Sequence, residues 1–149
     1  MARPTIEEVF AVQRVPLLRV AFLVCGSESA AEDIVQTVFA SAQGRWDTIR
    51  DPVGYLKRAV VNLAADGHRR RFRERRALES IPRQPTAIPE VDHTWFVLQQ
   101  LPVKQRTVVV LHFYEDVPLV EIAELLDRPA ATIRSDLRRA LIQLRRTMP

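Results

Sequence analysis

Apolar residues recur every three or four positions along most of this chain, and that spacing constrains its fold more than any other feature. In the stretch "AEDIVQTVFASA", for example, Ile34, Val35, Val38, Phe39 and Ala42 would share one face of a helix. No alternating apolar and polar stretch between turn residues persists long enough to predict a strand. We therefore expect an all-α protein.

The starts of the first helices carry local signals. A helix is expected from about Thr5, and Pro16 would kink or split it because proline lacks a backbone donor. Ser29 is followed three residues later by Glu32, the spacing of a capping box, which predicts the start of a second helix. Asp51 is a suitable N-cap for a third helix that would begin at Pro52.

The third helix is expected to have an apolar side and a polar side. The apolar stripe consists of Val53, Leu56, Val60 and Leu63. The polar stripe consists of Arg58, Asn62, Asp66 and Arg69. An asparagine on such a face is either an ordinary solvated residue or a partner for a base edge, since its amide offers both a donor and an acceptor.

A proline-containing stretch divides the chain. Residues 77–92 contain Pro82, Pro85 and Pro89 and show no helical stripe, so we expect a semi-extended linker. The chain then forms two small helical domains, residues 1–76 and 93–149, each of which needs a compact core.

The second domain shows the pattern of a helix-turn-helix. A short helix "LVEIAELL" precedes the three-residue break "DRP" and a long helix from Ala130 to about Arg146. The inward face of the long helix is expected to hold Ile133, Leu137, Ala140, Leu141 and Leu144, and another face holds Ala131, Arg134, Ser135 and Arg138. The second helix of such a motif enters the major groove of DNA, although other helical hairpins can imitate the pattern.

Basic charge is concentrated in one run. Residues 67–76, "GHRRRFRERR", hold six arginines and one glutamate, in a chain of net charge +4. A pI of about 10.0 points to a polyanionic partner, either nucleic acid or an anionic membrane surface. An arginine-rich segment also suits the C-terminal, negative end of a helix dipole. The run alone therefore does not distinguish a polyanion-binding site from an ordinary helix end. Membrane insertion is not expected, because the most apolar stretch, residues 15–25, is short and contains Arg19.

Catalytic chemistry is not indicated. The three histidines, at positions 68, 93 and 112, do not have metal-ligand spacing, and there is no glycine-rich phosphate loop. We expect no cofactor, no metal and no enzymatic activity. A single cysteine, Cys25, cannot form an internal disulfide, which suits a reducing cytoplasm.

Three segments together resemble a known family. They are "AEDIVQTVF", "RWDTIRDPVGYLKRAVVNLAADGHRR" and "LPVKQRTVVVLHFYEDVPLVEIAELLDRPAATIRSDLRRALIQLRR". In this order they are similar to the two domains of extracytoplasmic-function sigma factors of bacterial RNA polymerase, especially small actinobacterial members. The resemblance implies a cytoplasmic protein that binds core polymerase and directs promoter recognition, DNA melting and transcription initiation.

The resemblance also implies roles for individual residues. Asp33 and Gln36 would dock on the clamp of the polymerase beta-prime subunit. At the minus-ten element, Asn62 and Asp66 would lie near a flipped base, and Arg58, Arg69 and Arg70 would hold phosphates. At the minus-thirty-five element, the helix start would enter the major groove with Ala131, Thr132, Arg134, Ser135 and Arg138.

Some residues depart from the family pattern, and other functions stay open. Asp127 occupies a turn position that is usually glycine, and Pro129 one that is usually a serine or threonine cap. Asp136 stands where a basic residue is common and is expected to place negative charge near DNA. The alternatives are a stand-alone helix-turn-helix regulator and a decoy that occupies an anti-sigma factor. A separate anti-sigma factor is also open as a partner.

Overall fold

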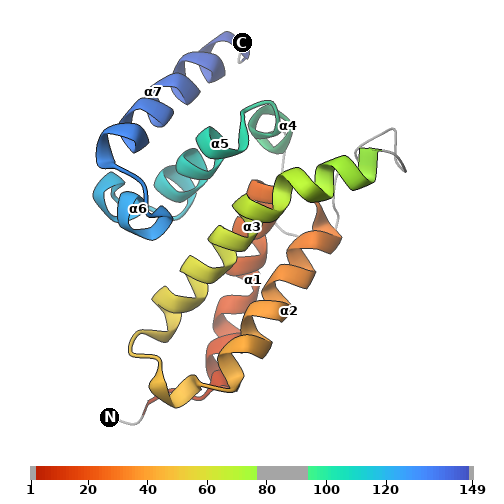
Figure 1. Ribbon diagram of the computed structural model, residues 1–149, viewed down its shortest axis with the longest axis vertical. Coiled ribbons are helices and arrows are strands. Elements are labelled where there is room, and N and C mark those ends of the chain that lie inside the picture. Colours follow the sequence, from red (N-terminus) through yellow and green to blue (C-terminus); the bar gives the residue numbers. More distant parts are fainter. Residues whose placement is uncertain (1–2, 77–93, 148–149) are drawn as a thin grey trace.

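The computed structural model describes residues 3–76 and 94–147, with side chains for 3–66 and 95–147. The expected linker, residues 77–92, lies outside the described residues. Every regular element in the described ranges is helical, which confirms the all-α fold class. Figure 1 shows long helices α1, α2 and α3 side by side, with α4, α5 and α6 packed against them and α7 on the outer side of α5 and α6.

Three helices form the first half of the molecule. They are α1 (Ile6–Cys25), α2 (Glu28–Gln43) and α3 (Pro52–Arg76), with a short 3-10 turn, η1 (Trp46–Thr48), before α3. Each of the three packs on the other two. The expected apolar face of α2 is buried, and Phe39 from this face meets Phe10 edge to face at 4.7 Å between ring centroids. Trp46 anchors the base of the bundle, where its Nε1 donates to the Pro4 carbonyl at 3.1 Å.

The start of α1 lies where the sequence predicted it, and the start of α2 does not. Thr5 Oγ1 accepts from the Glu8 amide at 3.1 Å, so α1 begins at Ile6, and it continues through Pro16 without a break. For α2, the cap is Ser27, whose Oγ accepts from the Ala30 amide at 3.2 Å. The expected capping box at Ser29 is therefore wrong. Ser27 offers the same hydroxyl two residues earlier, on extended backbone, and so starts the helix first.

The expected cap of α3 is confirmed, but its apolar stripe is partly wrong. Asp51 Oδ1 accepts from the Gly54 amide at 3.3 Å, and the helix begins at Pro52. Val53 and Leu63 are 39% and 42% exposed. The buried face instead consists of Leu56, Val60, Val61 and Ala64. Val61 and Ala64 are both fully buried, so the packed face of the helix is turned away from Leu63.

The second half contains the helix-turn-helix. Its elements are α4 (Thr94–Gln99), α5 (Val103–Val109), the π-helical turn η2 (Val110–Tyr114), α6 (Leu119–Leu126) and α7 (Ala130–Thr147). Helix α7 packs on α5 and α6. The three-residue break between α6 and α7 and the start of α7 at Ala130 are as predicted.

The two halves are packed against each other, which the sequence did not predict. The C-terminal end of α1 enters the corner between α4 and α5, where Phe22 stacks on Trp95. Gln99 Nε2 donates to the Leu23 carbonyl at 3.1 Å. On the other side of the interface α3 contacts α5 and α6. The buried apolar residues of both halves consequently form one continuous core.

Candidate nucleic-acid interface

The polar face of α3 looks toward the second half of the molecule. Arg58 is exposed, whereas Asn62 is partly buried and donates from Nδ2 to the Leu125 carbonyl of α6 at 3.4 Å. Asp66 is exposed at the rim of the same region. The sequence-predicted residues Arg69 and Arg70 lie in α3, but their side chains are outside what the structure describes.

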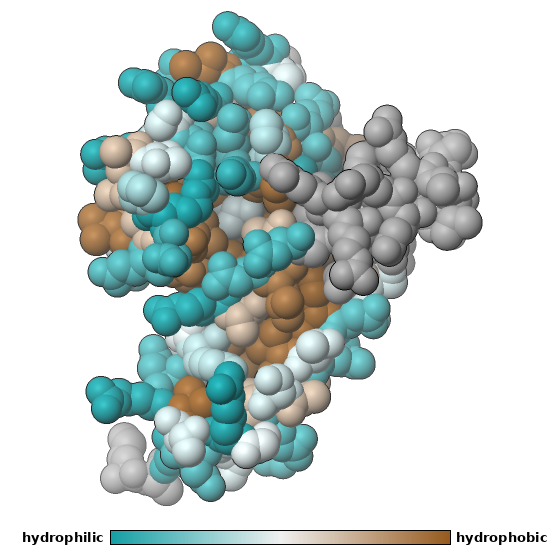
Figure 2. Space-filling view, in the orientation of Figure 1, coloured by the Kyte–Doolittle hydropathy of each residue, from teal (hydrophilic) through white to brown (hydrophobic). Residues whose placement is uncertain are grey.

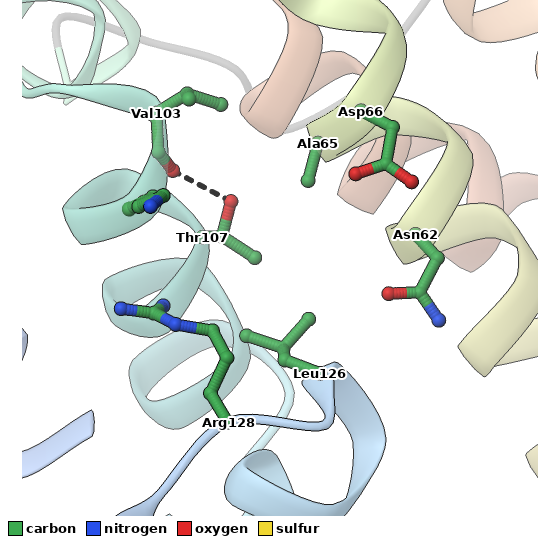
Figure 3. Close-up of a pocket in the computed structure, with 8 residues that line it drawn as sticks. Asn62, Ala65, Asp66, Val103, Thr107, Leu126 and Arg128 are labelled. Carbon is green, nitrogen blue, oxygen red and sulfur yellow. Dashed lines mark hydrogen bonds between the residues drawn. The ribbon is translucent and has the colours of Figure 1, made fainter. Parts of the chain in front are cut away.

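Asn62 and Asp66 line a cavity of about 270 Å³ between the halves. Figure 3 shows Asn62, Ala65 and Asp66 on α3 facing Thr107 of α5 and Arg128 of the turn after α6. Lys104 also lines the cavity, whereas the guanidinium of Arg128 is paired with Asp136 of α7. In this closed arrangement Asn62, one of the two residues predicted to meet an unstacked base, is hydrogen-bonded to α6, while Asp66 stays exposed at the rim.

The turn between α6 and α7 ends α6 in a Schellman arrangement. Asp127 adopts left-handed backbone angles (φ 53°, ψ 51°). The Arg128 amide donates to the Ala123 carbonyl at 3.0 Å, and the Asp127 amide to the Glu124 carbonyl at 3.3 Å. Asp127 thus fills the position that glycine prefers, and the turn keeps its geometry despite the substitution.

The predicted DNA-reading face of α7 is accessible. Ala131, Thr132, Arg134 and Arg138 are exposed and Ser135 is partly buried. Ala131, Arg134, Ser135 and Arg138 share one side of the helix, because they are spaced three or four positions apart, and Thr132 lies three positions before Ser135 at the edge of this side. Figure 2 shows hydrophilic side chains over much of the upper part of the molecule, where α7 lies in Figure 1. A small, polar and cationic helix face of this kind can approach base edges and phosphates.

Asp136 does not lie on that face, contrary to our expectation. It is 7% exposed, on the inward side of α7 with Ile133 and Ala140. Its Oδ2 is paired with Nη2 of Arg128. The carboxylate is turned inward because its helical position is three residues from Ile133 and four from Ala140, both of which are fully buried.

The predicted polymerase-binding residues occupy the outer face of α2. Asp33 and Gln36 are exposed and lie three positions apart, so they project from neighbouring turns. Their neighbours Ile34 and Val35 are buried and hold the helix against the bundle. The pair is therefore presented on a rigid helix, and its role stays a prediction.

Sequence reasoning missed Arg106, which holds the halves together. Arg106 is 3% exposed and donates to three carbonyls: Nε to Leu98 at 3.1 Å, Nη2 to Leu101 at 2.9 Å and Nη1 to Val24 at 2.5 Å. Burial lowers the pKa of its guanidinium to about 10, against a smaller opposing effect from Cys25. The signal that could have found it is a lone arginine in phase with the apolar residues of "VKQRTVVVL".

Lys57 and Glu115 form a second cross-link that the sequence did not indicate. Lys57 Nζ of α3 lies 3.6 Å from Oε1 of Glu115, just after η2. Burial raises the pKa of the Glu115 carboxyl, and the nearby cations Lys57 and Arg19 oppose that rise. In the described part of the chain no cluster of three or more histidine, cysteine, aspartate or glutamate residues could hold a metal ion. No described helix is long and apolar enough to cross a membrane.

Comparison with known proteins identifies both halves. Residues 12–74 match the family "Sigma-70 region 2", and residues 95–144 match "Sigma-70, region 4". The chain is 35% identical over 147 residues to the RNA polymerase sigma-E factor of Streptomyces coelicolor, covering 93% of this chain and 83% of that protein. It is 28% identical over 135 residues to the RNA polymerase sigma factor SigV of Bacillus subtilis, covering 85% and 81%.

The fold has a solved counterpart. The sigma factor RpoE from Bartonella quintana, solved in complex with the anti-sigma factor NepR, superposes with a TM-score of 0.73. The two chains are 22% identical, with 94% of this chain and 93% of that one covered. The sequence relationships and the order of the two matched regions show that this chain belongs to the extracytoplasmic-function group of the sigma-70 family of RNA polymerase sigma factors.

Proposed function

We propose that this sigma factor joins core RNA polymerase through the outer face of α2 and reads promoter DNA with α3 and α7. Asp33 and Gln36 contact the beta-prime clamp. Asn62 and Asp66 meet an unstacked base of the minus-ten element, while Arg58, Arg69 and Arg70 hold phosphates. The face formed by Ala131, Thr132, Arg134, Ser135 and Arg138 enters the major groove at the minus-thirty-five element.

One observation carries this proposal: regions 2 and 4 occur in one chain, and each presents an exposed polar helix face at the positions required. On α2 these are the exposed residues Asp33 and Gln36, and on α7 they include Arg134 and Arg138. The protein works by capturing unstacked bases and positioning polymerase, so it needs no catalytic residue of its own. Its place of action is the cytoplasm, with the polymerase.

Promoter binding requires the halves to separate. Leu125 is in contact with Asn62, and six residues of chain from Leu125 to Ala131 span at most about 22 Å. The two promoter elements are about 25 base pairs apart by their names, which is roughly 85 Å of duplex at about 3.4 Å per pair. The closed structure cannot place both readers on one promoter. Polymerase and DNA must therefore stabilise a more open arrangement by binding it more tightly.

The decoy alternative has lost its only sequence support. Asp136 was the residue expected to repel DNA, and it is buried and paired with Arg128. A separate anti-sigma factor remains a partner that we propose, because the Bartonella counterpart was solved with one. Such a partner would hold this sigma factor away from core polymerase.

Reconstituted transcription tests the proposed function. Purified protein added to bacterial core polymerase is expected to yield transcripts that start at defined positions on a template pool with randomised upstream and downstream elements. Core polymerase alone and protein alone are the controls. If the protein does not associate with core polymerase in a pull-down but binds duplex DNA tightly by itself, the stand-alone regulator replaces this proposal.

A further inference from the structure

Arg128 is tied to both helices of the helix-turn-helix. Its backbone amide donates to the Ala123 carbonyl of α6 at 3.0 Å. Its guanidinium is paired with the Asp136 carboxylate of α7. No other residue of the turn 127–129 can make both the amide bond to α6 and an ion pair with Asp136. Pro129 has no amide hydrogen, and the side chain of Asp127 is not positively charged. Arg128 is thus the joint between α6 and the recognition helix.

The start of α7 depends on this joint more than the start of an ordinary helix does. In the first turn of α7, which begins at Ala130, the amides of Thr132 and Ile133 donate to the Pro129 carbonyl at 3.0 and 3.1 Å. The proline side chain offers no acceptor that could act as an N-cap. The ion pair of Arg128 with Asp136 is a second link between the turn and α7, about one helical turn after Thr132 and Ile133.

The environment of the pair makes it effective. The side chains of Arg128 and Asp136 are 20% and 11% exposed. Shielded, charge-assisted contacts are stronger and less screened by salt than exposed surface pairs. Asp136 directly follows Ser135 and lies four residues after Thr132. Its ion pair therefore holds in place the helical turn of α7 that carries the DNA-reading residues.

We propose that the Arg128–Asp136 ion pair is a positioning device that sets how the recognition helix meets the upstream promoter element. This inference rests on the proposed function of α7. The pair holds the reading face at one angle to α6, so discrimination between upstream sequences depends on it. It also neutralises Arg128, which would otherwise add a cation beside DNA that attracts phosphates of any sequence.

Transcription from pooled templates tests the proposal. The templates carry randomised upstream and downstream elements, and sequenced transcripts give the selectivity at each element. Asp136→Asn is expected to reduce upstream selectivity about tenfold, a typical size for coupling between contacting residues. Downstream selectivity, which depends on α3, should stay within twofold of the wild type. Asp136→Glu keeps the carboxylate and should retain more upstream selectivity than Asp136→Asn.

Arg128→Gln and the double variant complete a cycle. If the pair acts as a unit, Arg128→Gln should lose upstream selectivity as Asp136→Asn does, and the double variant should lose no more than either single one. Arg128 also lines the cavity between the halves, whereas Asp136 does not, so an effect shared by both variants belongs to the ion pair. Glu124→Gln, an equal change of charge at an exposed position of α6, is the matched control.

Three outcomes are informative. Unchanged upstream selectivity in Asp136→Asn, with folding confirmed by circular dichroism at the assay temperature, overturns the positioning role. An equal loss at both elements also overturns it, since general destabilisation would reduce both. If the wild-type protein itself gives no promoter-dependent transcript, the proposed function fails, and that result is separate from the behaviour of the variants.

Discussion

The indole ring of Trp95 lies parallel to the ring of Phe22, with 5.5 Å between centroids and 4° between planes. Phe22 belongs to the last turn of α1 and Trp95 to α4, so this stack joins regions 2 and 4. Both residues are almost fully buried, at 1% and 3% exposure. Aromatic contacts of this kind add to the stability gained from burying apolar area. The stack therefore stabilises the closed arrangement that promoter binding must open.

Arg106→Met should destabilise the protein more than any exposed substitution. The change removes the cation that three carbonyls share, those of Val24, Leu98 and Leu101, and leaves them buried without that donor. A loss of about 3 kcal/mol in the free energy of unfolding is expected, since hydrogen bonds to charged groups are worth about 1.5–3 kcal/mol. Urea unfolding measures it, with Lys104→Met on the same helix as control. A loss below about 0.5 kcal/mol in Arg106→Met would show that the three bonds contribute little.

Glu115→Gln should stabilise the protein at neutral pH more than at acidic pH. Burial raises the pKa of the Glu115 carboxyl in the folded state above its unfolded value. The folded state therefore binds the Glu115 proton more tightly than the unfolded state does. The stabilisation that this proton gives is complete below the unfolded pKa and is lost as pH rises through the folded pKa. Glutamine removes this dependence. Unfolding free energies of both proteins between pH 4 and about pH 8 measure the difference, and a difference that is constant with pH would contradict the assignment.

Asp127→Gly should stabilise the turn before α7. Asp127 has φ 53°, a conformation that costs a residue with a Cβ atom about 1 kcal/mol and glycine very little. Part of that gain is offset because glycine loses more backbone freedom on folding, so we expect about 0.5 kcal/mol. Thermal unfolding measures the change, and Asp127→Ala is the control that should destabilise. A lower melting temperature for Asp127→Gly would mean that the aspartate side chain itself stabilises the turn.

The sequence predicted the parts of this fold that depend on local chemistry. The cap at Asp51, the break at 127–129 and the buried face of α2 follow from periodicity and capping, and all three are confirmed. The expectation that Asp136 lies near DNA was wrong, although its spacing of three from Ile133 and four from Ala140 already places it beside the expected inward face. Arg106 was missed because its acceptors include the Val24 carbonyl, 82 residues away in sequence. Local patterns do not show such distant contacts.

Asn62→Ala should impair promoter opening without loosening the closed structure much. The contact from Asn62 Nδ2 to the Leu125 carbonyl, at 3.4 Å, is longer than a typical hydrogen bond, so its loss should cost only about 0.5 kcal/mol. Loss of the amide that meets an unstacked base should cost about 1–3 kcal/mol at the promoter. Permanganate footprinting of the melted region measures opening, and urea unfolding measures stability. Normal opening by Asn62→Ala would remove Asn62 from the predicted minus-ten site.

The double variant Asp33→Ala/Gln36→Ala should weaken binding to core polymerase and leave the fold intact. Both side chains are exposed on α2 and make no contribution to its buried face, so the melting temperature should stay close to the wild type. Central interface residues typically cost at least about 2 kcal/mol when truncated, so the affinity for core polymerase should fall at least about thirtyfold. Fluorescence anisotropy of labelled protein with core polymerase measures this affinity.

Gln43→Ala, a change at an exposed glutamine at the other end of α2, is the matched control and should bind normally. If the double variant binds as tightly as Gln43→Ala, polymerase is held by another surface of region 2.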